Sequence, residues 1–171
     1  EIKGSTVGVV GTGSIGSLVA EKYAMMGAKV VACDLYENEH LKEAYQVEYM
    51  SMEDVFHRAD IVSLHMKVTK ENENSIGDEL FNAMKDGALL VNVARAELVD
   101  RNALVRALSQ GTLGGAAIDV YNSEPPSEED YALAKRDDVI ATPHIGYYTQ
   151  EANDNSIIMT VDSILKAIDA I

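Results

Sequence analysis

Short apolar runs alternate along the chain with longer segments in which apolar residues recur at helical spacing. The runs predict strands over residues 6–10, 29–33, 61–64, 88–92, 113–119 and 139–141, with a short strand around 47–49. Helical spacing predicts helices over residues 14–26, 39–44, 51–58, 77–84, 100–108 and 151–171. Strands that alternate with helices are typical of a parallel sheet with crossover helices. We therefore expect an α/β fold, a Rossmann-type doubly wound parallel sheet of strand order 3-2-1-4-5-6 with one extra edge strand.

Local signals indicate where several of these helices begin and end. Ser51, followed three residues later by Asp54, has the form of a capping box, and Asp100 is a suitable N-cap. Gly27 and Gly111 follow two of the helices, where glycine is favoured because it readily adopts a positive φ.

Two segments stand apart from the alternation. Residues 122–138 contain Pro125, Pro126 and several acids, and we expect them to be the only extended loop. The last helix carries a single apolar stripe. Its members are Ile157, Ile158, Val161, Ile164, Leu165, Ile168 and Ile171.

Composition narrows the class of protein. The 171 residues are 47% hydrophobic and 25% charged, which fits one soluble globular domain over residues 1–171. The formal net charge of −14 repels phosphate backbones and anionic lipids, so we expect no nucleic-acid or membrane partner. Cys33 is the only cysteine, which excludes an intramolecular disulfide and a cysteine metal cluster, and we expect no metal. With no signal-like segment, these features favour a cytoplasmic location.

A glycine-rich loop, residues 11–16, directly follows the first predicted strand and opens the first helix. Gly11 permits the tight turn, Gly13 lets a pyrophosphate approach the backbone, and Gly16 allows close packing of helix on strand. The exposed N–H groups and the helix dipole favour the pyrophosphate charge. We expect a dinucleotide to contact Gly11, Gly13, Ser14, Ile15 and Gly16. A glycine turn without a ligand is the alternative, and its place between strand and helix disfavours it.

Asp34 ends the second predicted strand, 18 positions after Gly16. A carboxylate there can accept hydrogen bonds from the adenosine ribose diol. It would repel a 2′-phosphate, and no arginine lies nearby in the sequence to bind one, so NAD is favoured over NADP. The alternative is that Asp34 merely begins a loop.

Three further stretches end or follow predicted strands, and so lie at the carboxyl edge of the sheet, where ligands bind in this architecture. They span residues 91–100, 117–125 and 142–146. Arg95 offers a planar charged fork for a carboxylate, and His144 can exchange a proton near neutral pH. Glu124 could orient His144 and favour its charged form. Each alone fits a solvated, salt-bridged or structural residue, but together behind a nucleotide loop they indicate hydride transfer at a carbon next to a carboxylate.

In their order and spacing, these stretches resemble the NAD-binding domain of the D-isomer-specific 2-hydroxyacid dehydrogenases. That family includes D-3-phosphoglycerate, D-lactate and glyoxylate/hydroxypyruvate enzymes. The resemblance extends over essentially the whole chain and includes residues 6–13, 60–65 and 84–88. It implies hydride transfer between NAD(H) and a small D-2-hydroxy acid or 2-keto acid. It also implies a homodimer formed through the nucleotide-binding domains.

The resemblance also implies roles for single residues. Arg95 would hold the substrate carboxylate and carbonyl, and His144, with Glu124 as its partner, would donate the proton during keto-acid reduction. Asp119 would lie near the nicotinamide and its carboxamide. The residues implied at the cofactor on this side are Val93, Ala94, Arg95, Asp119, His144 and Gly146.

Two positions depart from the family pattern. Ala96 stands where a glycine usually follows the catalytic arginine, and we expect this to alter the loop that aims Arg95. Lys67 stands where a proline is usual, and we expect this to alter the wall beside the adenine.

Family members place a substrate-binding lobe before and after this domain, so we expect the chain to be the cofactor half, with that lobe absent. Because the lobe would exclude water from the site, the chain alone should turn over little or no substrate. An NAD-sensing, non-catalytic regulator resembling the C-terminal-binding proteins is the alternative. A redox-inert NAD domain of the adenosylhomocysteine hydrolase type is a third possibility, which the Arg95, Glu124 and His144 set disfavours.

The Asp34 argument predicts that NAD raises the melting temperature of the chain more than NADP does at equal concentration. The reason is that, at equal concentration, the nucleotide that binds the native state more tightly stabilises it more. Thermal denaturation with each nucleotide measures the difference, and equal shifts would contradict the assignment of Asp34.

Overall fold

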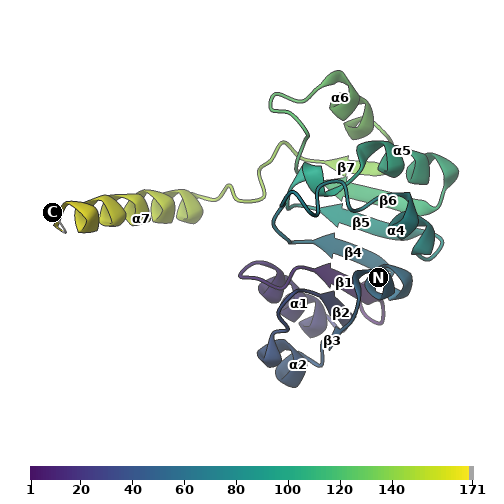
Figure 1. Ribbon diagram of the computed structural model, residues 1–171, viewed down its shortest axis with the longest axis horizontal. Coiled ribbons are helices and arrows are strands. Elements are labelled where there is room, and N and C mark those ends of the chain that lie inside the picture. Colours follow the sequence, from purple (N-terminus) through teal and green to yellow (C-terminus); the bar gives the residue numbers. More distant parts are fainter. Residues whose placement is uncertain (170–171) are drawn as a thin grey trace.

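A single seven-stranded sheet forms the centre of the computed structural model, which describes residues 1–169 (Figure 1). All strand pairs are parallel, in the order β3-β2-β1-β4-β5-β6-β7. The predicted doubly wound sheet is therefore confirmed, and β7 is the extra edge strand.

The elements follow the predicted alternation closely. The strands are β1 (Thr6–Val10), β2 (Lys29–Cys33), β3 (Glu48–Tyr49), β4 (Ile61–Leu64), β5 (Ala88–Asn92), β6 (Leu113–Ile118) and β7 (Val139–Ala141). The helices are α1 (Gly16–Met25), α2 (Glu39–Tyr45), α3 (Met52–Arg58), α4 (Asp78–Ala83), α5 (Arg101–Gln110), α6 (Glu128–Ala134) and α7 (Gln150–Asp169), with a 3-10 helix, η1, at Ala96–Leu98.

From β1, the chain adds strands β2 and β3 on one side of the sheet and then β4 to β7 on the other. Strand β1 therefore pairs with β2 on one side and β4 on the other. Val7 of β1, for example, lies between Val30 of β2 and Ile61 of β4. In an open parallel sheet, ligands bind outside the carboxyl ends of the strands at such a switch point. We therefore expect the ligand to bind at the loops that follow β1, β2 and β4.

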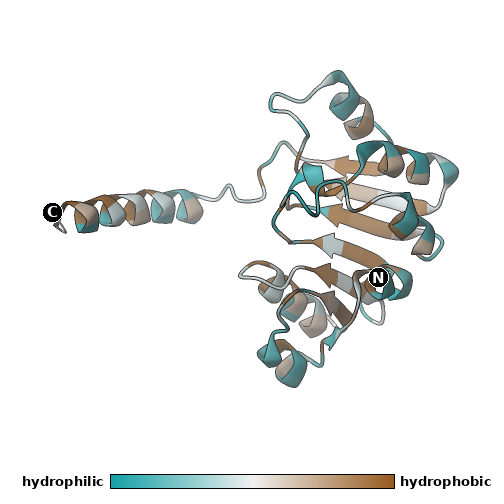
Figure 2. Ribbon diagram, viewed as in Figure 1, coloured by the Kyte–Doolittle hydropathy of each residue, from teal (hydrophilic) through white to brown (hydrophobic). Residues whose placement is uncertain are grey.

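Helices cover both faces of the sheet at β2, β1 and β4, and these strands are buried on both sides. One face of the sheet is less covered at β5 and β7, where Leu89 is 41% and Ile140 is 74% exposed. Much of the central strands is brown in Figure 2, with paler segments between.

Helices α1 and α2 pack on one face over a smaller apolar cluster that includes Ala20 and Leu41. Helices α3, α4 and α5 pack on the other face over a larger cluster around Phe56 and Phe81. At β2, β1 and β4, burial on both faces explains why these strands read as continuous apolar runs instead of alternating patterns.

The predicted helix ends are confirmed. The Ser51 hydroxyl accepts a hydrogen bond from the Asp54 amide at the start of α3. The Asp100 carboxylate accepts from two amides of the first turn of α5. Gly27 and Gly111 adopt φ values of +86° and +75° just after α1 and α5. These side-chain and glycine caps satisfy backbone groups that a helix end leaves unpaired.

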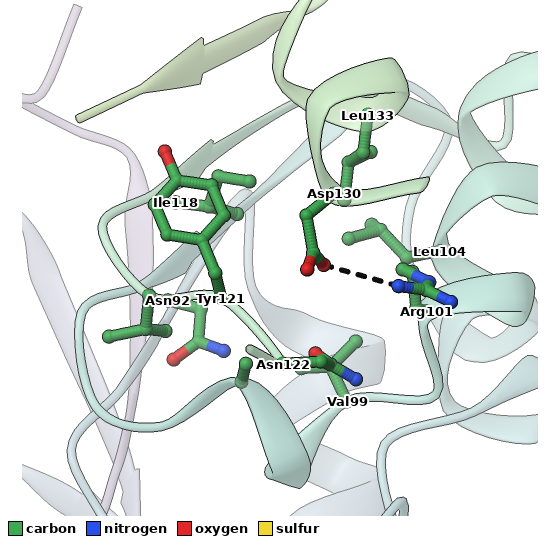
Figure 3. A pocket seen from close by; sticks show the side chains of 11 residues that line it. Asn92, Val99, Arg101, Leu104, Ile118, Tyr121, Asn122, Asp130 and Leu133 are labelled. Atoms are coloured by element: carbon green, nitrogen blue, oxygen red, sulfur yellow. Dashed lines mark hydrogen bonds and ion pairs between the residues drawn. The ribbon is translucent and has the colours of Figure 1, made fainter. Parts of the chain in front are cut away.

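The prediction of a single extended loop over residues 122–138 is wrong, because this segment contains α6. A capping box starts the helix: the Ser127 hydroxyl accepts from the Asp130 amide, and the Asp130 carboxylate accepts from the Ser127 amide. The same carboxylate is buried against Arg101 of α5, at 3.2 Å (Figure 3). Some of the acids that indicated a loop, Glu128, Glu129 and Asp130, therefore belong to the first turn of α6. Residues 65–77 instead form a long segment of turns, with one isolated bridge.

The last helix, α7, is present as predicted but extends away from the sheet (Figure 1). The predicted stripe lies along α7, and its large apolar side chains are exposed; Ile157, for example, is 64% exposed and Ile168 is 60% exposed. Ile171 lies outside the described residues. The stripe therefore covers no part of the described core. Within residues 1–169, no helix is long and apolar enough to cross a membrane.

Replacing Asp130 with alanine should destabilise the fold. It removes the capping box and leaves the Arg101 guanidinium, which is 26% exposed, without its buried partner. Losing one member of such a pair costs about 3 kcal/mol of unfolding free energy, measurable by urea denaturation. Asp137→Ala, which removes an exposed carboxylate nearby, should change the free energy by less than about 0.5 kcal/mol. Equal effects of the two changes would contradict this role of Asp130.

Candidate nucleotide and active site

The glycine loop joins β1 to α1 through contacts too close for side chains. A Cβ atom at Gly16 would lie 1.8 Å from the Gly11 carbonyl oxygen. Gly11 has a φ of +92°, and a Cβ there would lie 2.6 Å from the Met66 nitrogen. A Cβ at Gly13, in contrast, would meet no atom within 4 Å. Gly11 and Gly16 are therefore needed for packing, whereas Gly13 faces open space.

Backbone donors at this open side lack partners in the protein. Within the described residues, the amides of Gly13, Ser14 and Ile15 donate to no protein acceptor. They lie at the N-terminus of α1, where the helix dipole favours negative charge. The loop thus presents free N–H groups over the carboxyl end of β1, as a phosphate-binding turn requires.

Asp34 lies directly behind the glycine loop. Its Oδ2 atom accepts a hydrogen bond of 2.5 Å from the Thr12 amide, and its Oδ1 atom accepts one of 3.2 Å from the Tyr36 amide. Burial alone would raise the pKa of Asp34, but these backbone hydrogen bonds outweigh it and hold the pKa below its usual range. The carboxylate is therefore ionised near neutral pH and fixed at the end of β2.

A second carboxylate, Asp119, follows β6 and fastens the loop after β7. Its Oδ1 atom accepts hydrogen bonds from the Thr142 hydroxyl and the Ile145 amide, and its Oδ2 atom accepts one from the Gly146 amide at 2.8 Å. Burial would raise the pKa of Asp119, and these donors more than offset that effect, so the pKa lies below its usual range. A Cβ at Gly146 would lie 2.9 Å from the same carboxylate. Asp119 thus shapes the turn that carries His144.

His144 lies at the centre of that turn, beside Glu124. Its Nδ1 atom is 2.5 Å from a Glu124 carboxylate oxygen. The His144 backbone has a φ of +55°, an uncommon value for a residue with a side chain, and one of a kind that occurs often at functional sites. With Nδ1 directed at Glu124, Nε2 is the ring nitrogen left for a ligand. The imidazole is half exposed, so a small molecule can reach it.

Arg95 extends from the turn after β5. Buried Asn92 holds this turn: its amide nitrogen donates to the Arg95 carbonyl at 2.9 Å, and its oxygen accepts from the Ala94 amide. The Arg95 side chain is exposed, and its Nη1 atom donates to the Ala94 carbonyl. Strands β5 and β7 are separated by β6, so their ends are about 10 Å apart. Arg95 and His144 therefore both lie at the carboxyl edge of the sheet, on loops that follow β5 and β7.

The two departures from the expected pattern have different surroundings. Ala96 is buried at the start of η1 and is not among the described residues with positive φ, so the alanine causes no backbone strain. Lys67 is exposed, and its carbonyl accepts a hydrogen bond from the Asn72 side chain at 2.8 Å.

A small pocket lies behind the edge, between α5 and α6 (Figure 3). It is lined by Asn92, Tyr121 and the Arg101–Asp130 pair, and Arg95, Glu124 and His144 are not part of its lining. The Tyr121 hydroxyl donates a hydrogen bond to the Thr142 carbonyl at 2.8 Å. Through this hydrogen bond, the residues around the pocket contact the turn that carries His144. Among residues 1–169, no group of three or more His, Cys, Asp or Glu side chains could hold a metal ion.

Residues 1–146 match the family model described as "D-isomer specific 2-hydroxyacid dehydrogenase, NAD binding domain". The chain belongs to this family. Its fold, the glycine loop and the ionised Asp34 fit the NAD cofactor that the family description names.

Similar proteins agree with this membership. An aromatic 2-oxoacid reductase from Clostridium sporogenes is 38% identical over 94% of the chain, which covers 52% of that protein. A D-lactate dehydrogenase from Treponema pallidum is 37% identical over 95% of the chain and 52% of its own length. The solved structure of an NAD complex of a D-isomer specific 2-hydroxyacid dehydrogenase from Lactobacillus delbrueckii ssp. bulgaricus superposes with a TM-score of 0.88. It is 36% identical, over 96% of this chain and 53% of that one. The chain thus spans about half the length of these relatives.

The NAD-binding domain shows contacts that the sequence pattern did not indicate. Thr12 and Tyr49 on the nucleotide side, and Thr142 beside Asp119, are joined to site residues by side-chain hydrogen bonds. Their partners lie more than 20 positions away in the sequence, so no local spacing could identify them. In the sequence, the only indication that Thr12, Tyr49 and Thr142 belong to the site is their position near the ends of strands.

Alanine at two positions of the glycine loop should separate folding from binding. Gly16→Ala places a Cβ against the Gly11 carbonyl, so it should lower the unfolding free energy by about 1–3 kcal/mol and weaken NADH binding. Gly13→Ala meets no protein atom, so it should leave stability unchanged and weaken NADH binding by filling the phosphate space. Thermal denaturation and NADH fluorescence titration measure the two effects. Unchanged NADH affinity in Gly13→Ala would contradict the placement of the pyrophosphate.

Proposed function

We propose that the chain is the cofactor half of an NAD-dependent oxidoreductase that transfers a hydride between NAD(H) and a small D-2-hydroxy acid or 2-keto acid. The pairing of His144 Nδ1 with Glu124 at 2.5 Å, on the carboxyl edge of a family-matched NAD domain, carries this proposal. The solved structure of a D-lactate dehydrogenase from Aquifex aeolicus, 35% identical to this chain, is a complex with NAD and lactic acid, which supports the substrate class.

In the proposed reaction, the nicotinamide supplies or accepts the hydride, and the chain's own side chains handle charge and protons. His144 would donate its Nε2 proton to the forming alkoxide oxygen during keto-acid reduction. Glu124 would hold the ring through Nδ1 and stabilise the imidazolium. Arg95, exposed on the loop after β5, would bind the substrate carboxylate and carbonyl with its guanidinium fork.

The cofactor contacts follow from the same arrangement. The glycine loop, including Ser14 and Ile15, would bind the pyrophosphate, and Asp34 would accept hydrogen bonds from the adenosine ribose. Val93, Ala94, Asp119 and Gly146 would border the nicotinamide end. The exposure of Val93, at 44%, is consistent with a surface that a ligand covers.

A non-catalytic NAD-sensing regulator is the second candidate. The relatives described above are named as reductases and dehydrogenases, which favours the enzyme.

We also infer a cytoplasmic homodimer. The single free thiol of Cys33 supports a reducing compartment. Exposed apolar residues along α1, among them Leu18 and Met25, support pairing through the nucleotide-binding domain.

The proposal is tested in the longer polypeptide that the length of the relatives leads us to expect. Wild-type protein should oxidise NADH with at least one member of a panel of small 2-keto acids. His144→Ala should lower kcat by about 10²- to 10⁴-fold, because it removes the general acid. NADH affinity should remain nearly unchanged, since the nucleotide contacts lie mainly elsewhere.

Two results would count against the roles assigned. Activity that survives His144→Ala would show that another group donates the proton. Appreciable keto-acid-dependent NADH oxidation by residues 1–171 alone would show that no second lobe is needed. His57→Ala, an exposed histidine on α3, is the matched control and should leave activity unchanged.

A further inference from the structure

Three side chains from three different segments form a line of hydrogen bonds beneath the glycine loop. The Tyr49 hydroxyl, on edge strand β3, donates to the Thr12 hydroxyl oxygen at 2.9 Å. The Thr12 hydroxyl in turn donates to Asp34 Oδ2 at 3.3 Å. The residues are separated by up to 37 positions in the sequence and meet at the carboxyl ends of β1 and β2.

The direction of these hydrogen bonds is set at the Tyr49 end. The Tyr49 hydroxyl oxygen accepts a hydrogen bond from the backbone N–H of Asn38 at 3.1 Å. The single proton of the Tyr49 hydroxyl is therefore available for Thr12. Because Thr12 receives that proton, its own proton points to the Asp34 carboxylate. Hydrogen bonds in such a chain polarise and strengthen one another.

Tyr49 therefore ties together the two segments that enclose Asp34. Thr12, which is buried, belongs to the glycine loop, and Asn38 ends the turn that begins after Asp34. That turn also carries the Tyr36 amide, which donates to Asp34 Oδ1. Both oxygens of the carboxylate are thus held by segments that the Tyr49 hydroxyl connects.

Counting acceptor sites shows what is left for a ligand. A carboxylate has about four lone-pair sites. Oδ2 accepts from the Thr12 amide and hydroxyl, whereas Oδ1 accepts from the Tyr36 amide, so the remaining capacity for a ligand lies mainly on Oδ1. A carboxylate held this way cannot turn aside, so it accepts from a ribose hydroxyl and repels a phosphate in the same place.

We propose that Tyr49 is a positioning residue that sets the preference for NAD over NADP by fixing the orientation of the Asp34 carboxylate through Thr12 and Asn38. The inference rests on the proposed NAD-dependent function. Without the Tyr49 hydroxyl, the Asn38 amide and the Thr12 oxygen lose a partner, and the turn after Asp34 loosens. Asp34 can then swing away from an incoming 2′-phosphate.

The test compares the binding of NADH and NADPH to the chain by calorimetry or by nucleotide fluorescence. Tyr49→Phe removes one oxygen and keeps the ring, which packs beside the cluster under α1 and α2. We expect the dissociation constant for NADH to rise about 3- to 10-fold, the worth of one or two hydrogen bonds. NADPH binding should stay the same or tighten, so the NADPH-to-NADH ratio of dissociation constants should fall by at least the same factor.

Tyr23→Phe is the matched control. Tyr23 packs against the same cluster from α1, and no side-chain hydrogen bond of its hydroxyl is found within residues 1–169. The ratio should remain that of the wild type. In an Asp34→Asn background, Tyr49→Phe should no longer change the ratio, because the carboxylate through which it acts is gone.

Thr12 provides an independent arm that does not alter the tyrosine. Thr12→Val removes the hydroxyl that links Tyr49 to Asp34 and should lower the NADPH-to-NADH ratio of dissociation constants. Thr12→Ser keeps a hydroxyl and should retain most of the wild-type ratio.

The possible failures are distinguishable. If wild-type protein binds neither nucleotide, the proposed function fails, and this inference fails with it. If wild-type protein prefers NADH but Tyr49→Phe weakens both nucleotides equally, or neither, then Tyr49 has only a structural role and the inference alone is overturned.

Discussion

The arrangement of the nucleotide-binding half depends on how closely the start of α1 can approach the end of β1. The Gly11 carbonyl occupies the place where a side chain at residue 16 would begin, and the Met66 backbone does the same at residue 11. The Gly11 amide also donates to the Cys33 carbonyl, so one turn contacts the ends of β1, β2 and β4 together. Any side chain at these glycines would push apart the strand ends that define the switch point. The open face at Gly13 exists because the rest of the turn is so tight.

Three carboxylates fasten the loops that surround this edge. Asp34 holds the glycine loop, Asp119 holds the turn of His144, and Asp130 starts the helix that follows Glu124. Each has a pKa below its usual range, because hydrogen bonds to the ionised form outweigh the cost of burial. The stability they contribute is present above about pH 4 and is lost as the pH falls through their lower folded-state pKa values. In a chain of net charge −14, these three acids accept hydrogen bonds from backbone N–H groups and from side-chain donors alike.

The sequence was sufficient for what depends on local pattern. Continuous apolar runs predicted β2, β1 and β4 because helices cover both faces of the sheet there. Asp100 and Gly111 predicted helix ends because caps act over a few residues. The position of Glu124 and His144 after strands predicted that they lie at one edge. Helix α6 was missed because Pro125, Pro126 and the neighbouring acids indicated a loop, although Ser127 and Asp130 have the same capping-box spacing as Ser51 and Asp54. The Tyr49–Thr12–Asp34 connection was missed for a different reason, since strand pairing in space, and not spacing along the chain, brings those residues together.

The outermost strands of the sheet are very short. At one side β3 has two residues, and its Glu48 side chain pairs with Arg58 at 3.0 Å. At the other side β7 has three residues, and Pro143, which has no N–H to donate, follows two residues after its end. Such edges offer few free backbone groups to a neighbouring strand, which limits growth of the sheet from one molecule to the next. The short edge strands therefore disfavour partners that would bind by adding a strand to the sheet.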